Sequence, residues 1–290
     1  MDALAHQIFS GLATGSIYAS IALALVMVYQ STGHINFAQG EMATFSAFIA
    51  WTLMHAGMSY WAAFFLTLGL SFIGGVLIHR LIVRPVERAS PLTNVIVFVG
   101  LLVILNSLAG WIFDYTIKVF PSPFSKDRTI DSVFYSPHEF GSVSVMLAMM
   151  GALYAFFRFT ELGLAMRAAA QNPDSARLVG IRVSWMLALG WGLASAIGAV
   201  AGMMVAPAIY LDPNMMSGVL IYGFASALLG GIDSPWGATA GGFIVGVLEN
   251  LLGAYLIGTE LKMTVALVLI VGILTIKPNG LFGKHLVTRV

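Results

Sequence analysis

Long apolar runs with almost no charge follow one another along nearly the whole chain, and they limit its fold more than any other feature. Only 9% of the 290 residues are Asp, Glu, Lys or Arg, whereas a typical soluble domain carries about 25%. A soluble protein with so few charges would lack the polar side chains that cover a water-facing surface. We therefore expect an all-α, polytopic membrane protein.

The lengths of the runs suggest how many helices there are. A bilayer core about 30 Å thick needs roughly 20 apolar helical residues. We expect eight to nine transmembrane or re-entrant helices, because the first two runs and the seventh are suited to re-entrant or broken segments. No Lys or Arg precedes the first run, so we expect it to belong to the mature protein and not to a secretory signal. The runs are 6–30, 40–56, 60–78, 92–113, 142–159, 184–206, 217–232, 236–256 and 260–276.

The basic residues predict the orientation of the chain. Ten of the fourteen Lys and Arg residues lie in three segments that a nine-span alternation places on one side. Basic residues favour the cytoplasmic side, so we expect the N-terminus outside, the C-terminus inside, the 114–141 loop outside and the 158–183 loop inside. The ten residues are Arg80, Arg84, Arg88, Arg158, Arg167, Arg177, Arg182, Lys277, Lys284 and Arg289.

A polar, glycine-containing stretch, residues 33–41 (GHINFAQGE), separates the first two runs. Asn36 could cap the next helix, with Gln39 reaching back in a capping box. Alternatively, small residues such as Gly40 and their backbone amides meet a polar solute, because irregular backbone at membrane depth is tolerated only beside protein or a watery cavity. Glu41 enters an apolar helix, where a carboxylate costs about 2.5–3.5 kcal/mol, so we expect it to face the interior or the interface.

Two further polar residues lie within apolar runs. Asn106 and Glu249 are functional candidates by default, and the alternative is a structural hydrogen bond to a neighbouring helix or partner subunit. A second apolar stretch is interrupted by glycine and polar residues at 230–237. Two interrupted stretches in corresponding halves of a transporter often mark its transport site and belong to an inverted repeat, and whether this chain has such a repeat stays open. Glycine pairs spaced by four predict close helix packing: Gly11/Gly15, Gly198/Gly202 and Gly242/Gly246.

Sequence patterns of catalysis are missing. The chain has no HExxH, GxSxG or Walker A pattern, and the absence of cysteine excludes disulfides and thiolate metal sites. A net charge of +1 creates no strong field for nucleic acid. We therefore predict that the chain is not an enzyme, has no catalytic or metal site, binds no cofactor itself and does not bind nucleic acid.

The 158–183 segment is apolar for a free loop. Residues 164–171 suit a short helix, and Asn172 then predicts the cap of a second helix that ends at Gly180. Pro173 suits its first position, and Asp174 lies near its positive end. A helical elbow of this kind suits docking to another protein, and the alternative is a solvated loop.

Several segments, in this order, resemble the LivH-type permeases of branched-chain amino acid ABC importers over essentially the full chain. Each segment alone is weak, but their shared order is specific. The segments are 11–19 (GLATGSIYA), 33–41, Arg84-Pro85, 163–180 and 229–238 (LGGIDSPWGA) with Gly241-Gly242.

The resemblance implies a single permease domain over 1–290, multi-pass in the bacterial cytoplasmic (inner) membrane, with 114–141 as a periplasmic loop. It would import branched-chain or related amino acids or amides by alternating access. The implied partners are a second, LivM-like permease, two ATPase subunits that bind ATP and Mg, and a periplasmic substrate-binding protein. An ion-coupled secondary transporter is the alternative, and Glu41 and Glu249 would be its acidic candidates.

The ATPase-coupling residues follow from the same resemblance. Residues 163–180 match the ATPase-docking element, although Arg167-Ala168-Ala169 stands where the general ABC permease signature begins Glu-Ala-Ala. The coupling role is therefore expected at Arg167, Ala168, Asn172, Asp174 and Gly180. The candidate substrate-pathway residues are the polar residues singled out above within or between the apolar runs, together with Tyr18 of the 11–19 segment. They are Tyr18, Asn36, Gln39, Gly40, Glu41, Asn106 and Glu249.

Overall fold

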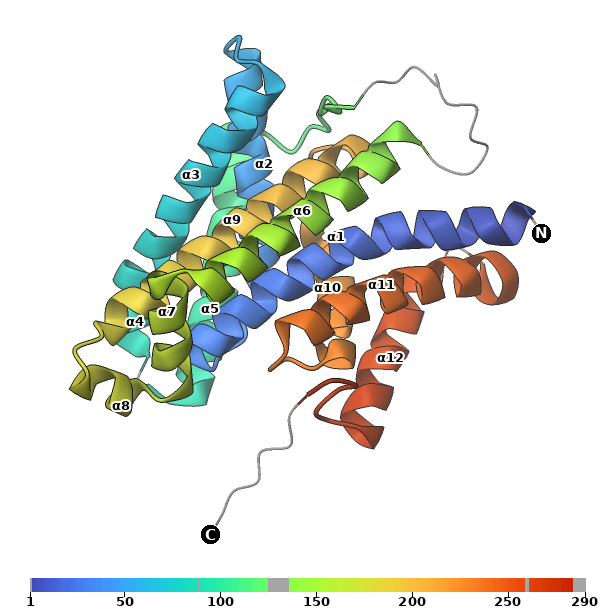
Figure 1. The fold of residues 1–290 in the computed structure, drawn as a ribbon. Helices are drawn as coiled ribbons and strands as arrows, with labels where there is room; N and C mark the ends of the chain where they lie inside the picture. The colour runs from blue at the N-terminus through green and yellow to red at the C-terminus, as the bar shows by residue number, and fades with distance from the viewer. Residues whose placement is uncertain (1, 88, 125–135, 259–260, 284–290) are drawn as a thin grey trace. The chain divides into compact units, whose positions relative to one another are not determined.

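The computed structural model describes residues 2–87, 89–124, 136–258 and 261–283, and this part of the chain is built from helices (Figure 1). The predicted all-α class is confirmed, and every apolar run coincides with a helix. These helices are α1 (Asp2–Thr32), α2 (Gln39–His55), α3 (Tyr60–Ile78), α5 (Pro91–Phe113), α6 (Pro137–Phe159), α9 (Val183–Ile209), α10 (Met216–Gly230), α11 (Pro235–Leu252) and α12 (Lys262–Ile276).

Six helices in the described residues are long and apolar enough to cross a membrane. α1 is one continuous helix of 31 residues, so the first run is not broken. α2, α10 and α12 are shorter, with 17, 15 and 15 residues. The total of eight or nine crossings and the sides of the two termini stay predictions. Arg88, Lys284 and Arg289, and residues 125–135 of the 114–141 loop, lie outside the described residues.

Two helices continue into a π-helical turn. η1 (His79–Val83) and the short α4 (Arg84–Val86) extend α3, and η2 (Gly253–Ile257) extends α11. Pro85 cannot donate a hydrogen bond to the carbonyl of Leu81, and its ring would clash with that carbonyl in a regular α-helix. A wider turn just before the proline relieves this conflict, and α3 therefore runs past the predicted end at residue 78.

The described helices group into two compact units. Unit 1 comprises Met1–Val26, Phe124–Ser144 and Ser217–Val290, and unit 2 comprises Met27–Pro123 and Val145–Met216. The expectation of a single permease domain over 1–290 stays a prediction.

Glycines bring α1 and α11 into backbone contact within unit 1. A Cβ added to Gly15 would lie 2.9 Å from the Cα of Phe243, and one added to Gly246 would lie 2.4 Å from the Cα of Gly15. Gly11 and Gly242 are equally close to the opposite helix. The predicted packing role of these two glycine pairs is confirmed, because no side chain fits where the backbones touch.

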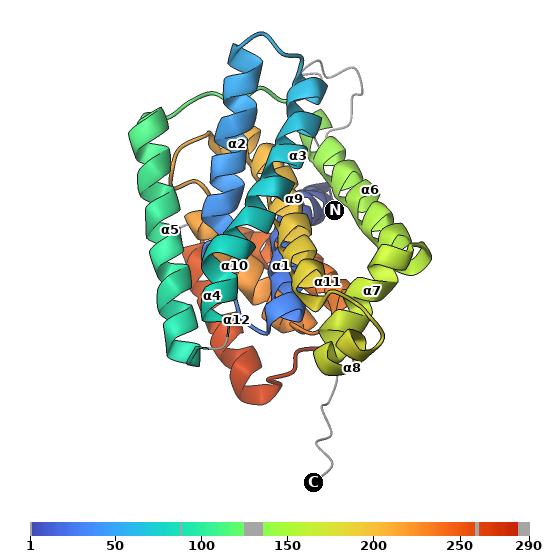
Figure 2. The ribbon, with the colours of Figure 1, turned by 90° about the vertical axis from the view of Figure 1, so that its left-hand side faces the viewer.

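α9 is central in unit 2, with α2 and α3 packed against it (Figure 2). A Cβ on Gly202 would lie 2.4 Å from the carbonyl oxygen of Ala43 in α2, and a Cβ on Gly75 of α3 would lie 2.5 Å from that of Trp191. A Cβ on Gly198 would lie 2.6 Å from the side-chain nitrogen of Gln39. The third predicted glycine pair therefore also lies in a packing face.

Several helix ends follow their local sequence. Ser90 and Ser234 cap α5 and α11, and their hydroxyl oxygens accept backbone N–H bonds at 3.2 and 3.1 Å. α12 ends at Ile276, before Lys277-Pro278. The chain then turns back along α10, because the N–H of Leu281 donates to the carbonyl of Leu229 at 2.7 Å and that of Phe282 to Gly230 at 3.1 Å. These bonds satisfy carbonyls that the end of α10 would otherwise leave free.

The close contact between α1 and α11 predicts how a larger residue there would affect stability. Gly246→Leu would force a side chain into the backbone of α1, and overpacking of this kind typically costs about 1–3 kcal/mol. We expect a lower unfolding temperature in detergent, measured by thermal denaturation. Gly272→Leu in α12 is the matched control, because a Cβ there meets nothing within 4 Å. Equal unfolding temperatures for the two variants would contradict the importance of the contact.

Candidate functional site

Tyr18 of α1 and Glu249 of α11 meet inside unit 1. The hydroxyl of Tyr18 donates to Oε2 of Glu249 at 2.6 Å, and the ring of Tyr18 stacks on Tyr222 with centroids 4.7 Å apart. Glu249 is only 7% exposed. Of the two expectations for Glu249, the structure shows the hydrogen bond to a neighbouring helix.

The pairing follows from how α1 and α11 cross. Gly11 lies beside Val247 and Gly15 beside Phe243, so the two helices run antiparallel. Side chains lean toward the N-terminus of their own helix, and Tyr18 and Glu249 therefore lean toward each other across the glycine contact.

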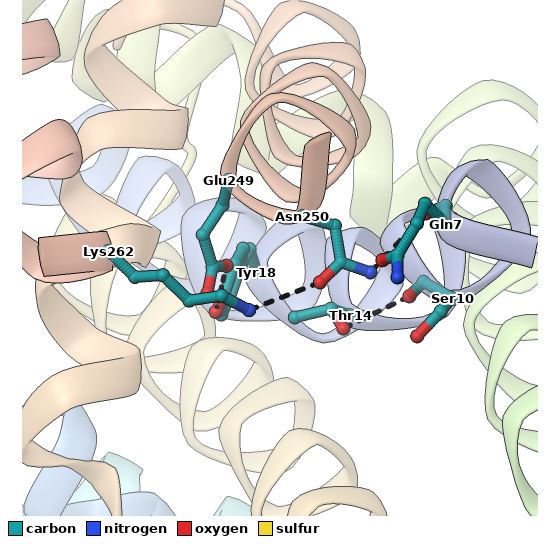
Figure 3. A network of polar contacts seen from close by, with 7 residues as sticks. All are labelled: Gln7, Ser10, Thr14, Tyr18, Glu249, Asn250 and Lys262. Atoms are coloured by element: carbon teal, nitrogen blue, oxygen red, sulfur yellow. Dashed lines mark hydrogen bonds and ion pairs between the residues drawn. The ribbon is translucent and has the colours of Figure 1, made fainter. Parts of the chain in front are cut away.

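Glu249 also has a cationic partner that the sequence reasoning missed. Nζ of Lys262 in α12 lies 3.6 Å from Oε1 of Glu249 and donates to Oδ1 of Asn250 at 3.2 Å. Asn250 in turn donates to the carbonyl of Gln7 at 3.3 Å, so one network connects α1, α11 and α12 (Figure 3). The available signal was a lysine inside the last apolar run, where a cation is expected to pair with an acid.

Asn36 and Gln39 form a second polar cluster, in unit 2, and both are fully buried. Oδ1 of Asn36 accepts from the N–H of Ala38 at 3.0 Å, and its Nδ2 donates to Oε1 of Gln39 at 3.1 Å. Nε2 of Gln39 donates to the carbonyl of Ala194 in α9 at 3.0 Å. The predicted capping box is wrong: Ala38 is the N-cap of α2, and the Gln39 amide bonds α9 instead. Gly40, next in α2, is also buried.

Glu41 and Asn106 form the third cluster, also in unit 2. Glu41 is 5% exposed, which confirms that it faces the interior. Nδ2 of Asn106 donates to Oε2 of Glu41 at 3.2 Å, to the carbonyl of Pro213 at 3.1 Å and to Oδ1 of Asn214 at 3.0 Å. Among the described residues, Glu41 has no ion-pair partner.

The sequence reasoning missed the turn that completes this cluster. Residues 212–214 (Asp-Pro-Asn) connect α9 to α10, and Oδ1 of Asp212 accepts from the N–H of Asn214 at 2.7 Å. The composition of the turn was a usable signal, since Asp, Pro and Asn are typical turn formers. Its approach to Asn106, 107 residues away from Pro213, was not visible in the pattern.

The predicted elbow is present as α7 (Glu161–Gln171) and α8 (Pro173–Leu178). Oδ1 of Asn172 accepts from the N–H of Ser175 at 2.9 Å, as expected for the cap. Gly180 has φ +86°, a conformation that glycine adopts at no steric cost, so its role as terminator is confirmed. α7 begins three residues before the predicted start, because Thr160 caps it through the N–H of Gly163 at 3.0 Å.

The elbow packs on α9 and leaves an apolar tip exposed. Ala169 of α7 and Ala176 of α8 are buried against Val183 and Leu187 of α9. At the other end, Leu178 and Val179 are 89% and 76% exposed. Of the five coupling candidates, Ala168 is half-buried and the rest are exposed: Arg167, Asn172, Asp174 and Gly180.

The chain is similar to known proteins over nearly its whole length. High-affinity branched-chain amino acid transport system permease protein LivH of Salmonella typhimurium is 32% identical, covering 98% of this chain and 97% of that protein. LivH of Escherichia coli K12 is 31% identical with the same coverage. The permease protein BraD of Pseudomonas aeruginosa is 30% identical, again over 98% and 97%.

The family described as "Branched-chain amino acid transport system / permease component" matches residues 7–274. This range includes α2 to α11 completely and all but the first turn of α1 and the end of α12. The resemblance to LivH-type permeases is thereby confirmed. The chain is a LivH-like transport permease component that belongs to the branched-chain amino acid permease family.

Proposed function

We propose that this chain is one of two membrane-spanning permease subunits of an ATP-driven importer that moves branched-chain amino acids, or related amino acids and amides, into the cytoplasm by alternating access. The α7–α8 elbow carries the proposal, because it presents an apolar tip at Leu178-Val179 that suits docking to another protein. The chain's own sequence has no nucleotide-binding pattern, so the ATPase activity belongs to another subunit.

The partners follow from the same proposal. A second, LivM-like permease completes the pathway, two ATPase subunits bind ATP and Mg, and a periplasmic binding protein delivers the substrate. The assembly lies in the bacterial cytoplasmic membrane, with the 158–183 segment inside and the 114–141 loop outside. The names of the relatives, which are transport system permease proteins for branched-chain amino acids, support this substrate class.

The packing of the elbow explains how coupling would work. Ala169 and Ala176 contact α9 directly, and α9 is the helix on which α2 and α3 pack. A force on the tip would therefore move α9 and, with it, the core of unit 2. Exposed Arg167, Asn172 and Asp174 lie on the same element and supply polar contacts to the ATPase.

The ion-coupled alternative needs a buried acid that is free to exchange its ion. Glu249 has partners in Tyr18 and Lys262, and these fix it as part of a helix-to-helix network. Glu41 is unpaired by any cation among the described residues, but ion or proton relays in membranes use several titratable residues in succession. The bonded partner of Glu41 in this part of the chain is the neutral amide of Asn106. These contacts favour the ATP-driven assembly.

The first test concerns the proposed coupling role of the elbow tip at Leu178-Val179. Leu178→Asp should lower ATP-dependent uptake by at least about tenfold, equivalent to roughly 1.4 kcal/mol of lost coupling, because a charge replaces the apolar tip without disturbing buried packing. Uptake of radiolabelled leucine, isoleucine and valine is measured in proteoliposomes that hold the complete assembly. Ile117→Asp, at an exposed apolar residue outside the elbow, is the control and should transport normally.

Two results would count against these assignments. Normal uptake by Leu178→Asp would remove the coupling role from the elbow tip. Transport by the chain alone, without ATPase subunits and insensitive to vanadate, would overturn the proposed function itself.

The network around Glu249 separates the two candidate functions. Glu249→Gln and Lys262→Met should each destabilise the protein by about 1–3 kcal/mol, because removing one partner leaves the other unsatisfied. The double variant should recover part of this loss, because the two residues are coupled. The protein that remains folded should still transport with ATP. Complete loss of transport in folded Glu249→Gln, together with dependence on an ion gradient, would favour the secondary transporter.

A further inference from the structure

Glu41 is a buried carboxylate without a counter-charge. It is 5% exposed, and its contact among the described residues is the neutral amide of Asn106, at 3.2 Å. Burying a charge is costly unless it is paired, so this position has a strong unmet attraction for a cation.

The acceptor oxygens at this position outnumber the available protons. Oε2 of Glu41, the carbonyl of Pro213 and Oδ1 of Asn214 all lie 3.0–3.2 Å from Nδ2 of Asn106. An amide nitrogen has two hydrogens and cannot serve three acceptors with a full bond each. A primary ammonium has three hydrogens and a positive charge, and therefore matches both the number and the charge of the acceptors.

The same chain shows what such a set of oxygens binds. In unit 1, Oε1 of Glu249 and Oδ1 of Asn250 lie 3.6 and 3.2 Å from Nζ of Lys262. A carboxylate and an asparagine oxygen there hold a primary ammonium supplied by the protein. Unit 2 repeats this pair of groups in Glu41 and Asn214 and adds a backbone carbonyl, but among the described residues no lysine reaches them.

We propose that Glu41, Pro213 and Asn214 form a binding site for a primary ammonium group, and that the ligand is the α-ammonium of the transported amino acid. The amide of Asn106 occupies the position of that group in this structure and swings aside when the ammonium enters. The identity of the ligand rests on the proposed function, whereas the ammonium chemistry of the site rests on the geometry alone.

The test uses the complete assembly in nanodiscs without the binding protein, so that selection by that protein does not enter. 3-Methylbutylamine is the probe, with 3-methylbutan-1-ol and 4-methylpentanoate as analogues that lack the ammonium. Of the three compounds, we expect only the amine to raise the unfolding temperature of the assembly.

Glu41→Gln should weaken amine binding roughly 10- to 100-fold, because hydrogen bonds to a charged group are stronger than neutral ones. Asn214→Ala should weaken it about 3- to 10-fold.

Two further variants keep the test decisive if Glu41→Gln folds poorly. Glu41→Asp keeps the charge and should retain part of the amine binding, and Glu87→Gln, a matched loss of one carboxylate in a segment away from this site, should bind as the unsubstituted protein does. A shift produced by Na⁺ in place of the amine, or the same shift in Glu41→Gln as in the unsubstituted protein, would overturn the proposal. Absence of any shift with the amine would also overturn it.

Uptake separates this proposal from the proposed function. With saturating binding protein restored, Glu41→Gln should slow ATP-dependent uptake of the amino acid by at least about tenfold. If the unsubstituted assembly shows no ATP-dependent uptake but still binds the amine through Glu41, the proposed function fails and the ammonium site stands. If uptake is normal in Glu41→Gln, the site is not on the transport route and the identification of its ligand fails.

Discussion

Backbone contact at glycines is the interaction on which the polar chemistry of this protein depends. Because Gly15 and Gly246 let α1 and α11 touch, Tyr18 and Glu249 come within hydrogen-bond distance, and Lys262 can then complete the network. In unit 2, small residues of α9 similarly leave room for the Gln39 amide to reach Ala194. A side chain at these glycines would clash with the opposite backbone, push the helices apart and disturb the alignment of the polar groups.

The sequence predicted what depends on neighbouring residues and missed what depends on distant ones. Apolar run length, serine caps and glycine spacing are local properties. In the described part of the chain, the helices over the apolar runs, the caps at Ser90 and Ser234 and the elbow follow from such properties. The capping box at Asn36 was wrong because the carbonyl of Ala194, 155 residues away, attracts Gln39. Lys262 and the turn at 212–214 became partners of predicted residues only through the packing of helices far apart in the chain.

The two buried glutamates show how the same group can have different roles within one membrane protein. Glu249 pairs with an ammonium that the protein itself supplies, on Lys262, and belongs to the network that connects α1, α11 and α12. Glu41 sits in a similar set of oxygens with a neutral amide in place of the cation. On the proposal above, a positively charged ligand supplies at Glu41 the partner that Lys262 supplies at Glu249, and the buried carboxylate is then paired as a buried charge requires.

α9 has a mechanical consequence beyond its place in the core of unit 2. It has 27 residues and, at about 1.5 Å per residue, is roughly 40 Å long, which exceeds the thickness of a bilayer core. The elbow packs on its first turns, and the Asp212–Asn214 turn follows its last residue. A tilt of this rod by a few degrees at the elbow would become a displacement of one or two ångströms at the far end, comparable to the difference between a good hydrogen bond and none. A tilt at the elbow end of α9 would therefore change the distances among the oxygens of Glu41, Pro213 and Asn214 at its other end.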